Sequence, residues 1–152
     1  MDSDVMIREA TDADIEAMVR LLRVLFTIEA DFHVNEAAQR RGLAMMLEDS
    51  DHRRVLVAEV EGSISGMCTG QALISTAEGG MAVLVEDLVV LEAYRGYGIG
   101  SRLLAAMEAW GFGIGARRLE LLADRENRPA LDFYQRKNWR QTRLVCLHKK
   151  EA

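Results

Sequence analysis

A glycine-rich turn between a predicted strand and a predicted helix is the feature that most constrains this chain. Residues 81–91 form an apolar run, rich in β-branched residues and interrupted only by Glu86 and Asp87, which predicts a mostly buried strand. After the turn at residues 95–101, apolar side chains recur at helical spacing, at Leu103, Leu104, Met107 and Trp110. The backbone N–H groups of such a turn point at one place beside the positive end of a helix dipole. This arrangement favours a phosphate ligand.

The glycine spacing narrows the kind of phosphate ligand. The phosphate loop of nucleotide triphosphatases needs a lysine directly before its serine or threonine, but here Gly100 precedes Ser101. The dinucleotide-binding fingerprint is G-x-G-x-x-G, whereas this turn is G-x-G-x-G. The segment Arg95-x-x-Gly98-x-Gly100 instead resembles the acyl-CoA pyrophosphate loop of the GNAT superfamily of N-acetyltransferases. The alternative is a connector in which glycine only permits a tight turn.

Length and composition predict a single domain, residues 1–152, because 152 residues with 49% hydrophobic content can form a real core. No apolar run approaches the ~20 residues of a membrane span, and the N-terminus is acidic where a signal peptide would be basic. We therefore expect a soluble, cytoplasmic protein without a membrane partner. The formal net charge of −5 argues against a nucleic-acid partner and is compatible with a cationic small-molecule substrate.

The cysteines and histidines show no pattern typical of a metal site, so we expect no metal. Cys68 and Cys146 lie in apolar, strand-like segments without a C-x-x-C motif, which predicts two buried, reduced thiols. We assign no role to the three histidines, His33, His52 and His148.

Hydrophobic periodicity predicts strands before, between and after helices. A capping box at residues 11–14 predicts the start of a helix that ends near residue 28, and a second helix carries Leu43, Met46 and Leu47. A further helix follows Asn127, with Pro129 in its first turn. The predicted strands are residues 5–9, 54–60, 64–75, 81–91, 118–123, 139–142 and 144–148. The glycines within strand 64–75, Gly66 and Gly70, indicate bulges or a close approach of another segment.

Residues 127–139 resemble the second hallmark of the same superfamily, N-x-x-A-x-x-F-Y-x-x-x-G-[FWA]. The matching residues are Asn127, Ala130, Phe133, Tyr134 and Trp139. Asn138 stands where the family has glycine, and asparagine is the next best residue in the left-handed conformation that ends a helix. Residues 85–90, V-E-D-L-V-V, resemble the family's fourth strand, and their Glu-Asp pair is similar to the diamine (spermidine/spermine) acetyltransferase subgroup.

The resemblance implies the GNAT fold, an α/β structure with a mixed, mostly antiparallel, twisted sheet of six to seven strands and about four helices. It also implies a β-bulge after which strands four and five separate. Acetyl-CoA is the implied co-substrate. Its pantetheine arm would pair with Leu88, Val89 and Val90 and contact Asn127. Its pyrophosphate would meet the turn, residues Arg95, Gly96, Tyr97, Gly98, Ile99, Gly100 and Ser101, through backbone amides. A homodimer is common in this family.

Acetyl transfer to an amine needs a neutral amine and a proton for the departing thiolate. By resemblance we assign Glu86 as the amine binder and as a base acting through water, and Tyr134 as the general acid. The pKa of a tyrosine phenol, near ~10, is close to that of an alkyl thiolate. Because adjacent strand residues point to opposite faces, Asp87 is expected to be a structural carboxylate bonded to backbone or arginine. Glu29 and Asp31 face a cationic acceptor or belong to a solvated loop.

Three functions remain open at this point. The leading interpretation is an acetyl-CoA-dependent N-acetyltransferase that acts on a primary amine of a small, cationic molecule by direct transfer in a ternary complex. The second is acetylation of protein α-amines or lysines. The third is a non-catalytic acyl-CoA-binding sensor, against which the presence of both Glu86 and Tyr134 argues.

Overall fold

The computed structural model describes residues 4–29 and 33–151. The chain divides into two compact units, Met1–Leu121 and Leu122–Ala152. The sequence showed no boundary at this point, and a single domain over residues 1–152 stays a prediction. Among the described helices, none is both long enough and apolar enough to cross a membrane.

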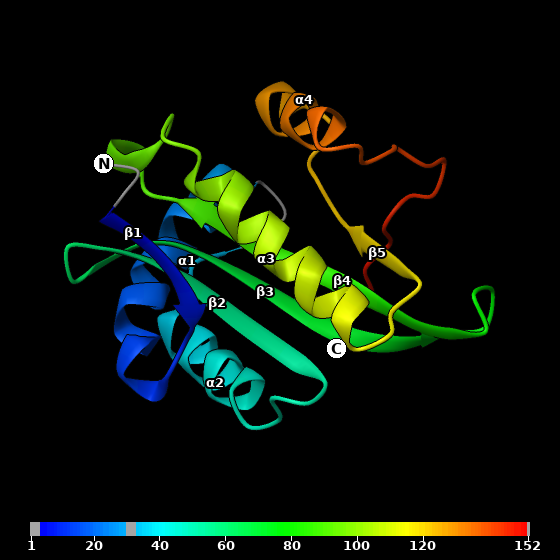
Figure 1. The fold of residues 1–152 in the computed structure, drawn as a ribbon, viewed down its shortest axis with the longest axis horizontal. Helices are drawn as coiled ribbons and strands as arrows, with labels where there is room; N and C mark the ends of the chain where they lie inside the picture. The colour runs from blue at the N-terminus through cyan, green and yellow to red at the C-terminus, as the bar shows by residue number, and fades with distance from the viewer. Residues whose placement is uncertain (1–3, 30–32, 152) are drawn as a thin grey trace. The chain divides into compact units, whose positions relative to one another are not determined.

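The first unit is built on a five-stranded sheet in the order β1-β2-β3-β4-β5 (Figure 1). Its strands are β1 (Val5–Glu9), β2 (Arg53–Val60), β3 (Ser63–Ser75), β4 (Gly80–Val90) and β5 (Arg118–Leu121). The pairs β1–β2, β2–β3 and β3–β4 are antiparallel, whereas β4–β5 is parallel. The predicted mixed, mostly antiparallel sheet is therefore confirmed.

The predicted number of six to seven strands is wrong for the part of the chain that the structure describes, which holds five. Residues 139–151 have no regular secondary structure, so the strands predicted at 139–142 and 144–148 are absent. An apolar segment becomes a strand only by pairing with a neighbouring strand, and this one has no such pairing. Its apolar side chains are instead exposed, Leu144 by 88% and Leu147 by 87%. For the same reason Cys146 is exposed, not buried as predicted, whereas Cys68 is buried.

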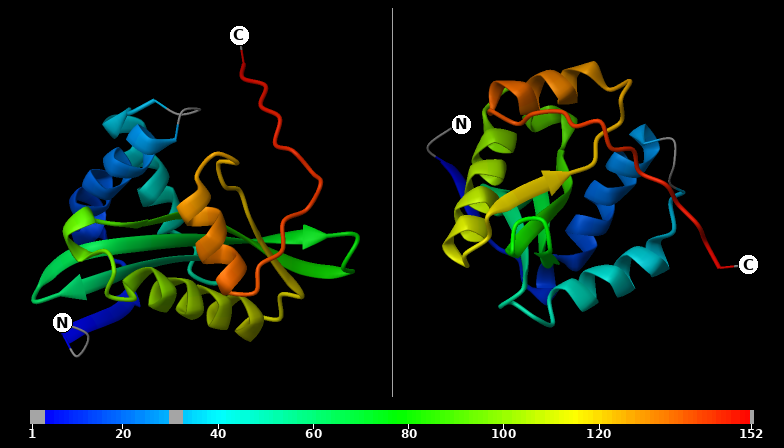
Figure 2. Two further views of the ribbon diagram at one scale, coloured as in Figure 1. Left: turned by 90° about the horizontal axis from the view of Figure 1, so that it is seen from above. Right: turned by 90° about the vertical axis from the view of Figure 1, so that its right-hand side faces the viewer.

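Helices cover both faces of the sheet, as Figure 2 shows for the first unit. Helices α1 (Ile15–Ile28) and α2 (Glu36–Met46) lie on one face, and α3 (Ile99–Gly113) lies on the other. With α4 (Arg128–Arg136) in the second unit, the prediction of about four helices is confirmed. The core under α1 and α2 is apolar and includes Met18, Leu22, Leu43, Val55, Val57, Met67 and Val89.

The predicted capping box is present, and it begins a 3-10 turn, Asp12–Asp14, that leads directly into α1. The backbone N–H of Thr11 donates to Asp14 Oδ2 at 2.8 Å. Arg8 donates to both carboxylate oxygens of Asp14, at 2.8 and 2.9 Å, and this hydrogen-bonded pair holds the pKa of Asp14 below its usual range. The contacts fix the first turn of α1 on the end of β1.

The glycines within β3 make room for α3. A Cβ at Gly66 would lie 3.1 Å from Leu103 Cδ1, and one at Gly70 would lie 2.5 Å from Met107 Sδ. Side chains of α3 therefore rest directly on the β3 backbone, which confirms the predicted close approach. This contact sets the height of α3 above the sheet and hence the position of its N-terminus.

Candidate functional site

A β-bulge in β4 creates the centre of the candidate site. Met67 of β3 pairs with Val89 and Thr69 pairs with Glu86, so Cys68 alone stands opposite two residues, Asp87 and Leu88. Asp87 has a φ of 54°, in the left-handed region that aspartate tolerates better than most residues. The predicted bulge is present, and it interrupts the regular alternation of side chains along β4.

Beyond the bulge, β4 leaves its other neighbour. The pairing of β4 with β5 ends at Val85 and Leu121, so the described residues of the first unit provide no strand beside residues 86–90 on that side. The backbone N–H of Leu91 donates to the Ser65 carbonyl on β3. In an antiparallel strand the backbone N–H and C=O groups of successive residues point alternately to one side and the other. Those of Val89 therefore also point toward β3, and those of Leu88 and Val90 point toward the open side. This edge has the shape that an extended ligand arm can pair with.

The glycine-rich turn lies at the end of this open edge and leads into α3. Gly96 and Gly98 have φ angles of 86° and 80°, and Gly98 is the N-cap of α3. The Gly98 carbonyl accepts the N–H of Arg102, so the helix is hydrogen-bonded from its first turn. The N–H groups of Ile99, Gly100 and Ser101 occupy that turn, where a helix has no internal acceptor for them. Together with the helix dipole they form a backbone anion site.

The Arg95 side chain hydrogen-bonds a backbone carbonyl of the protein itself. Its Nε donates to the Val90 carbonyl at 3.0 Å. This bond ties the turn to the end of β4 and uses the carbonyl that faces the open side. The contact gives the Arg95 side chain a structural role in the protein itself.

Glu86 lies on the face of the sheet that α1 and α2 cover. It pairs with Thr69, which pairs with Val55, and directly paired residues share a face. Val55 belongs to the core under α1 and α2. Although Glu86 is exposed as a residue, desolvation of its carboxylate raises its pKa. A raised pKa suits a group that takes up a proton near neutral pH.

Asp87 differs from its prediction. Among the described residues its carboxylate hydrogen-bonds the Thr69 hydroxyl, at 3.1 Å, and neither backbone nor arginine. Since Thr69 shares the face of Glu86, the two acidic residues are not separated by the sheet as strand alternation predicts. Burial, followed by the charge of Glu86, raises the pKa of Asp87 to about 6, against the lowering effect of the Thr69 hydrogen bond.

The raised pKa of Asp87 makes ionisation costly for the fold. The folded state keeps this proton up to about pH 6, whereas the unfolded chain releases it near pH ~3.9, so stability is lost as pH rises through that window. We expect Asp87→Asn to raise the free energy of unfolding by about 1–3 kcal/mol at neutral pH. The gain should vanish near pH ~3, where the Asp87 carboxyl is protonated in both the folded and the unfolded state. Asparagine also tolerates the left-handed backbone.

Urea unfolding at both pH values measures this effect, with Asp51→Asn, in an exposed turn, as the matched control. A gain for Asp87→Asn that is equal at the two pH values would contradict a titration origin.

Of the two acidic residues expected near the acceptor, Glu29 and Asp31, the structure describes only Glu29. Glu29 is the C-cap of α1, and its N–H donates to the Leu25 carbonyl. Asp31 lies outside the described residues.

The second unit contains the second hallmark motif, residues 127–139. Asn127 caps α4 and its Oδ1 accepts the Ala130 N–H at 3.3 Å. Asn138 ends the helix with a φ of 70°, as predicted, and the Trp139 N–H donates to the Tyr134 carbonyl. The Tyr134 ring packs against Phe133 at 5.2 Å between centroids and Trp139 at 6.1 Å. The motif thus fixes the aromatic ring on a capped helix.

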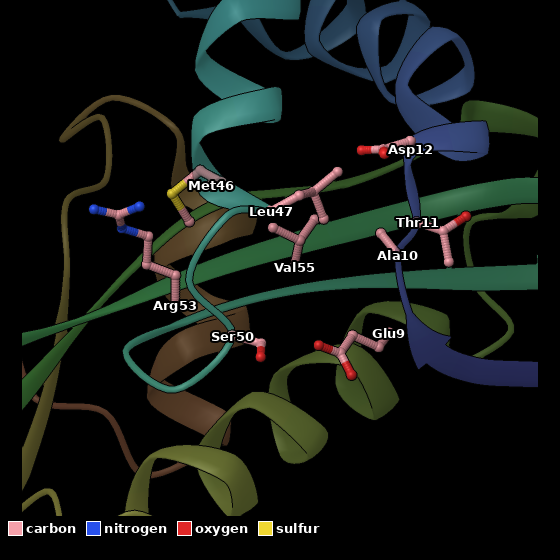
Figure 3. A pocket seen from close by; sticks show the side chains of 9 residues that line it. All are labelled: Glu9, Ala10, Thr11, Asp12, Met46, Leu47, Ser50, Arg53 and Val55. Atoms are coloured by element: carbon pink, nitrogen blue, oxygen red, sulfur yellow. The ribbon is translucent and has the colours of Figure 1, made fainter.

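A pocket of about 220 Å³ lies elsewhere in the first unit and includes none of the described site residues. Figure 3 shows its lining side chains, which come from the end of β1 and the residues just after it, and from the chain between the end of α2 and the start of β2. Its two charged side chains from β1 and β2 already have protein partners: Arg53 donates to the Met45 carbonyl, and Glu9 pairs with Arg54 at 2.7 Å. We assign no role to this pocket.

Sequence reasoning missed Thr69. The residue is 2% exposed and its hydroxyl contacts both the Glu86 carbonyl and the Asp87 carboxylate. The only signal in the sequence is a polar residue between Cys68 and Gly70 in a predicted strand. The described residues contain no group of three or more His, Cys, Asp or Glu that could hold a metal ion.

Comparison with solved structures supports the fold. The aminoglycoside N-acetyltransferase AAC(6')-Iy in complex with CoA superposes with a TM-score of 0.82 at 20% identity, covering 97% of this chain and 95% of the other. An aminoglycoside acetyltransferase from an uncultured soil metagenomic sample, in complex with sisomicin, gives 0.80 at 21% identity, covering 99% of each chain. At these identities the likeness concerns the fold alone.

Sequence comparison identifies the family. The aminoalkylphosphonate N-acetyltransferase of Salmonella typhimurium is 31% identical over 137 residues, covering 90% of this chain and 85% of that protein. The thialysine N-epsilon-acetyltransferase of Bos taurus is 32% identical over 142 residues, covering 86% and 81%. The model of the acetyltransferase (GNAT) family matches residues 15–139. This chain therefore belongs to the acetyltransferase (GNAT) family and is an N-acetyltransferase.

Proposed function

We propose that this enzyme transfers the acetyl group of acetyl-CoA to a primary amine of a small, cationic molecule, by direct transfer in a ternary complex. One observation carries the proposal. The edge of β4 that β5 leaves open leads, through the 3-10 turn Glu92–Tyr94, into a turn whose amides begin α3. A pantetheine arm needs an extended backbone to pair with, and its pyrophosphate needs an anion site at the end of that backbone. This chain provides both in sequence.

The nature of the acceptor follows from charge and from the relatives. Glu86 and Asp87 lie together at the bulge, and among the described residues neither forms an ion pair with a cationic side chain within 4.0 Å. A protonated amine can supply the missing positive charge. Two relatives above 30% identity are named for the acetylation of small amines, an aminoalkylphosphonate and thialysine. Both relatives support a small-molecule amine, and not a protein, as the acceptor of the acetyl group.

The roles within the reaction follow from the chemistry. Acetyl-CoA supplies the activated acetyl group as a thioester. We assign the outward N–H groups of Leu88 and Val90 to pairing with its arm and to polarising the acetyl carbonyl. We assign the backbone of residues 95–101 to the pyrophosphate and Asn127 to the arm. Glu86 binds the amine and accepts its proton through water, and Tyr134 protonates the departing thiolate.

The test of this function is release of free thiol from acetyl-CoA across a panel of aminoalkylphosphonates, diamines, lysine analogues, aminoglycosides and short peptides. Turnover with a small amine supports the proposal, and initial rates with both substrates varied should give intersecting double-reciprocal lines for a ternary complex. Turnover confined to peptides would overturn it in favour of protein acetylation. Tight binding of acetyl-CoA without turnover on any amine would favour a sensor.

We expect Glu86→Gln to raise the KM for a cationic amine by about tenfold, because the neutral amide cannot pair with the charge. Since the pKa of Glu86 is raised, kcat/KM of the wild-type enzyme should fall on the acidic side at a higher pH than an ordinary glutamate would cause. The Glu86→Gln variant should not show this fall. Steady-state kinetics over a pH series measures both effects. Glu48→Gln, the same change at an exposed position, is the control. An unchanged KM and pH profile would make Glu86 structural.

We also propose that the two units act as one acetyltransferase domain, because the family match at residues 15–139 spans the division at Leu121. A homodimer stays an expectation from the family resemblance, and light scattering of the purified chain measures it.

A further inference from the structure

The Thr69 hydroxyl at the β4 bulge has two acceptors for one proton. Its oxygen lies 3.2 Å from the Glu86 carbonyl oxygen and 3.1 Å from Asp87 Oδ2. Thr69 is 2% exposed, so solvent has little access to this position. Among the described residues, the Asp87 carboxylate has no other hydrogen bond and no ion pair.

A threonine hydroxyl donates one hydrogen bond, while a carbonyl oxygen and an ionised carboxylate only accept. When Asp87 is ionised, the hydroxyl cannot fully satisfy both oxygens. When Asp87 is neutral, its O–H donates to Thr69 Oγ1 and the Thr69 O–H donates to the Glu86 carbonyl. The second arrangement gives each of these oxygens a partner, whereas the first leaves the Glu86 carbonyl without the hydroxyl proton.

We infer that Thr69 is a positioning residue whose single hydroxyl proton links the protonation of Asp87 to the hydrogen bonding of the Glu86 backbone. On ionisation the Asp87 proton leaves to solvent, and the Thr69 O–H turns from the Glu86 carbonyl to the Asp87 carboxylate. The bulge therefore has two states, one with a neutral Asp87 and one with a second negative charge beside Glu86.

The surroundings of Asp87 favour its neutral state below about pH 6. Burial, and then the charge of Glu86, its neighbour on β4, raise the pKa of Asp87, and the Thr69 hydrogen bond lowers it, for a value of about 6. On β3 the Cys68 thiol is the ionisable neighbour, and burial holds its pKa far above neutrality, so it remains uncharged. In the part of the chain that the structure describes, no charged group of α1, α3 or β5 forms an ion pair with Asp87.

The consequence for catalysis rests on the proposed function. If a cationic amine binds beside Glu86, the second charge strengthens its binding, so affinity for the amine should rise as pH rises through about 6. Thr69 then sets the pH at which the acceptor site reaches its full charge.

The test follows the side-chain carboxyl carbon of Asp87 and the backbone carbonyl carbon of Glu86 by ¹³C NMR through a pH titration, without substrate. The Asp87 signal is assigned by its loss in Asp87→Asn. We expect both carbons to titrate with one common midpoint near 6. Thr69→Val, which keeps the shape and removes the hydroxyl, should raise the Asp87 midpoint by about one pH unit and uncouple the Glu86 carbonyl. Thr69→Ser should restore both properties.

Ser65→Ala is the matched control, because Ser65 also has a buried hydroxyl on β3, bonded to the Ala58 carbonyl at 3.2 Å. It should leave the Asp87 midpoint unchanged. Two results would overturn the inference. One is a Glu86 carbonyl shift in the wild-type protein that does not change with the titration of Asp87, and the other is an unchanged Asp87 midpoint in Thr69→Val. The wild-type measurement decides alone if the valine variant does not fold. All these readouts are free of turnover, so they stand or fall separately from the proposed function.

Discussion

Replacing Tyr134 with phenylalanine is expected to lower kcat by about 10²–10⁴-fold while the affinity for acetyl-CoA stays unchanged. The range is what a positioned general acid contributes. The loss arises because the thiolate must then take its proton from solvent.

Phenylalanine should preserve the local structure. Contacts of the Tyr134 ring with Phe133 and Trp139 involve the aromatic faces and edges, which phenylalanine keeps. The Tyr134 carbonyl, which accepts the N–H groups of Lys137 and Trp139 at the end of α4, belongs to the backbone and is unaffected. A fall in kcat therefore reports the phenol and not the helix.

Single-turnover thiol release and calorimetric titration of acetyl-CoA separate the chemical step from binding. Tyr94→Phe, at a half-buried position in the 3-10 turn Glu92–Tyr94, is the matched control and should keep wild-type kcat. Full activity in the Tyr134 variant would remove this residue as the acid.

The sequence predicts those parts of the fold that depend on local backbone chemistry. The capping box at Thr11 and Asp14 and the left-handed stop at Asn138 need only their own residues and a few neighbours, and both are present. The glycine-rich turn is of the same kind, since its positive φ angles at Gly96 and Gly98 follow from residue type.

Features that depend on a partner strand were predicted less well. The apolar character of residues 144–148 suits a strand but says nothing about whether another strand is available to pair with it. Asp87 was assigned to the face opposite Glu86 by strand alternation, and an extra residue in β4 cancels that rule at this position. Thr69 acquires its role only through the register of β3 against the bulge, which neither strand specifies alone.

Gly98→Val should weaken acetyl-CoA binding by about a hundredfold or more. Gly98 has a φ of 80°, which a β-branched residue adopts only at considerable cost, so valine shifts the backbone at the N-cap of α3. That shift turns aside the amides proposed to hold the pyrophosphate, and losing two charge-assisted hydrogen bonds accounts for this factor.

The protein itself has room for the added side chain, because a Cβ at Gly98 meets no atom within 4 Å. Loss of binding therefore reports backbone conformation and the space reserved for the ligand. Gly113→Val is the matched control: it places the same residue at the other end of α3, where a Cβ also meets nothing within 4 Å and φ is not positive. Calorimetric titration with acetyl-CoA, and circular dichroism to check the fold, compare the two variants. Equal affinity in both would mean that the turn is only a connector and that the anion site lies elsewhere.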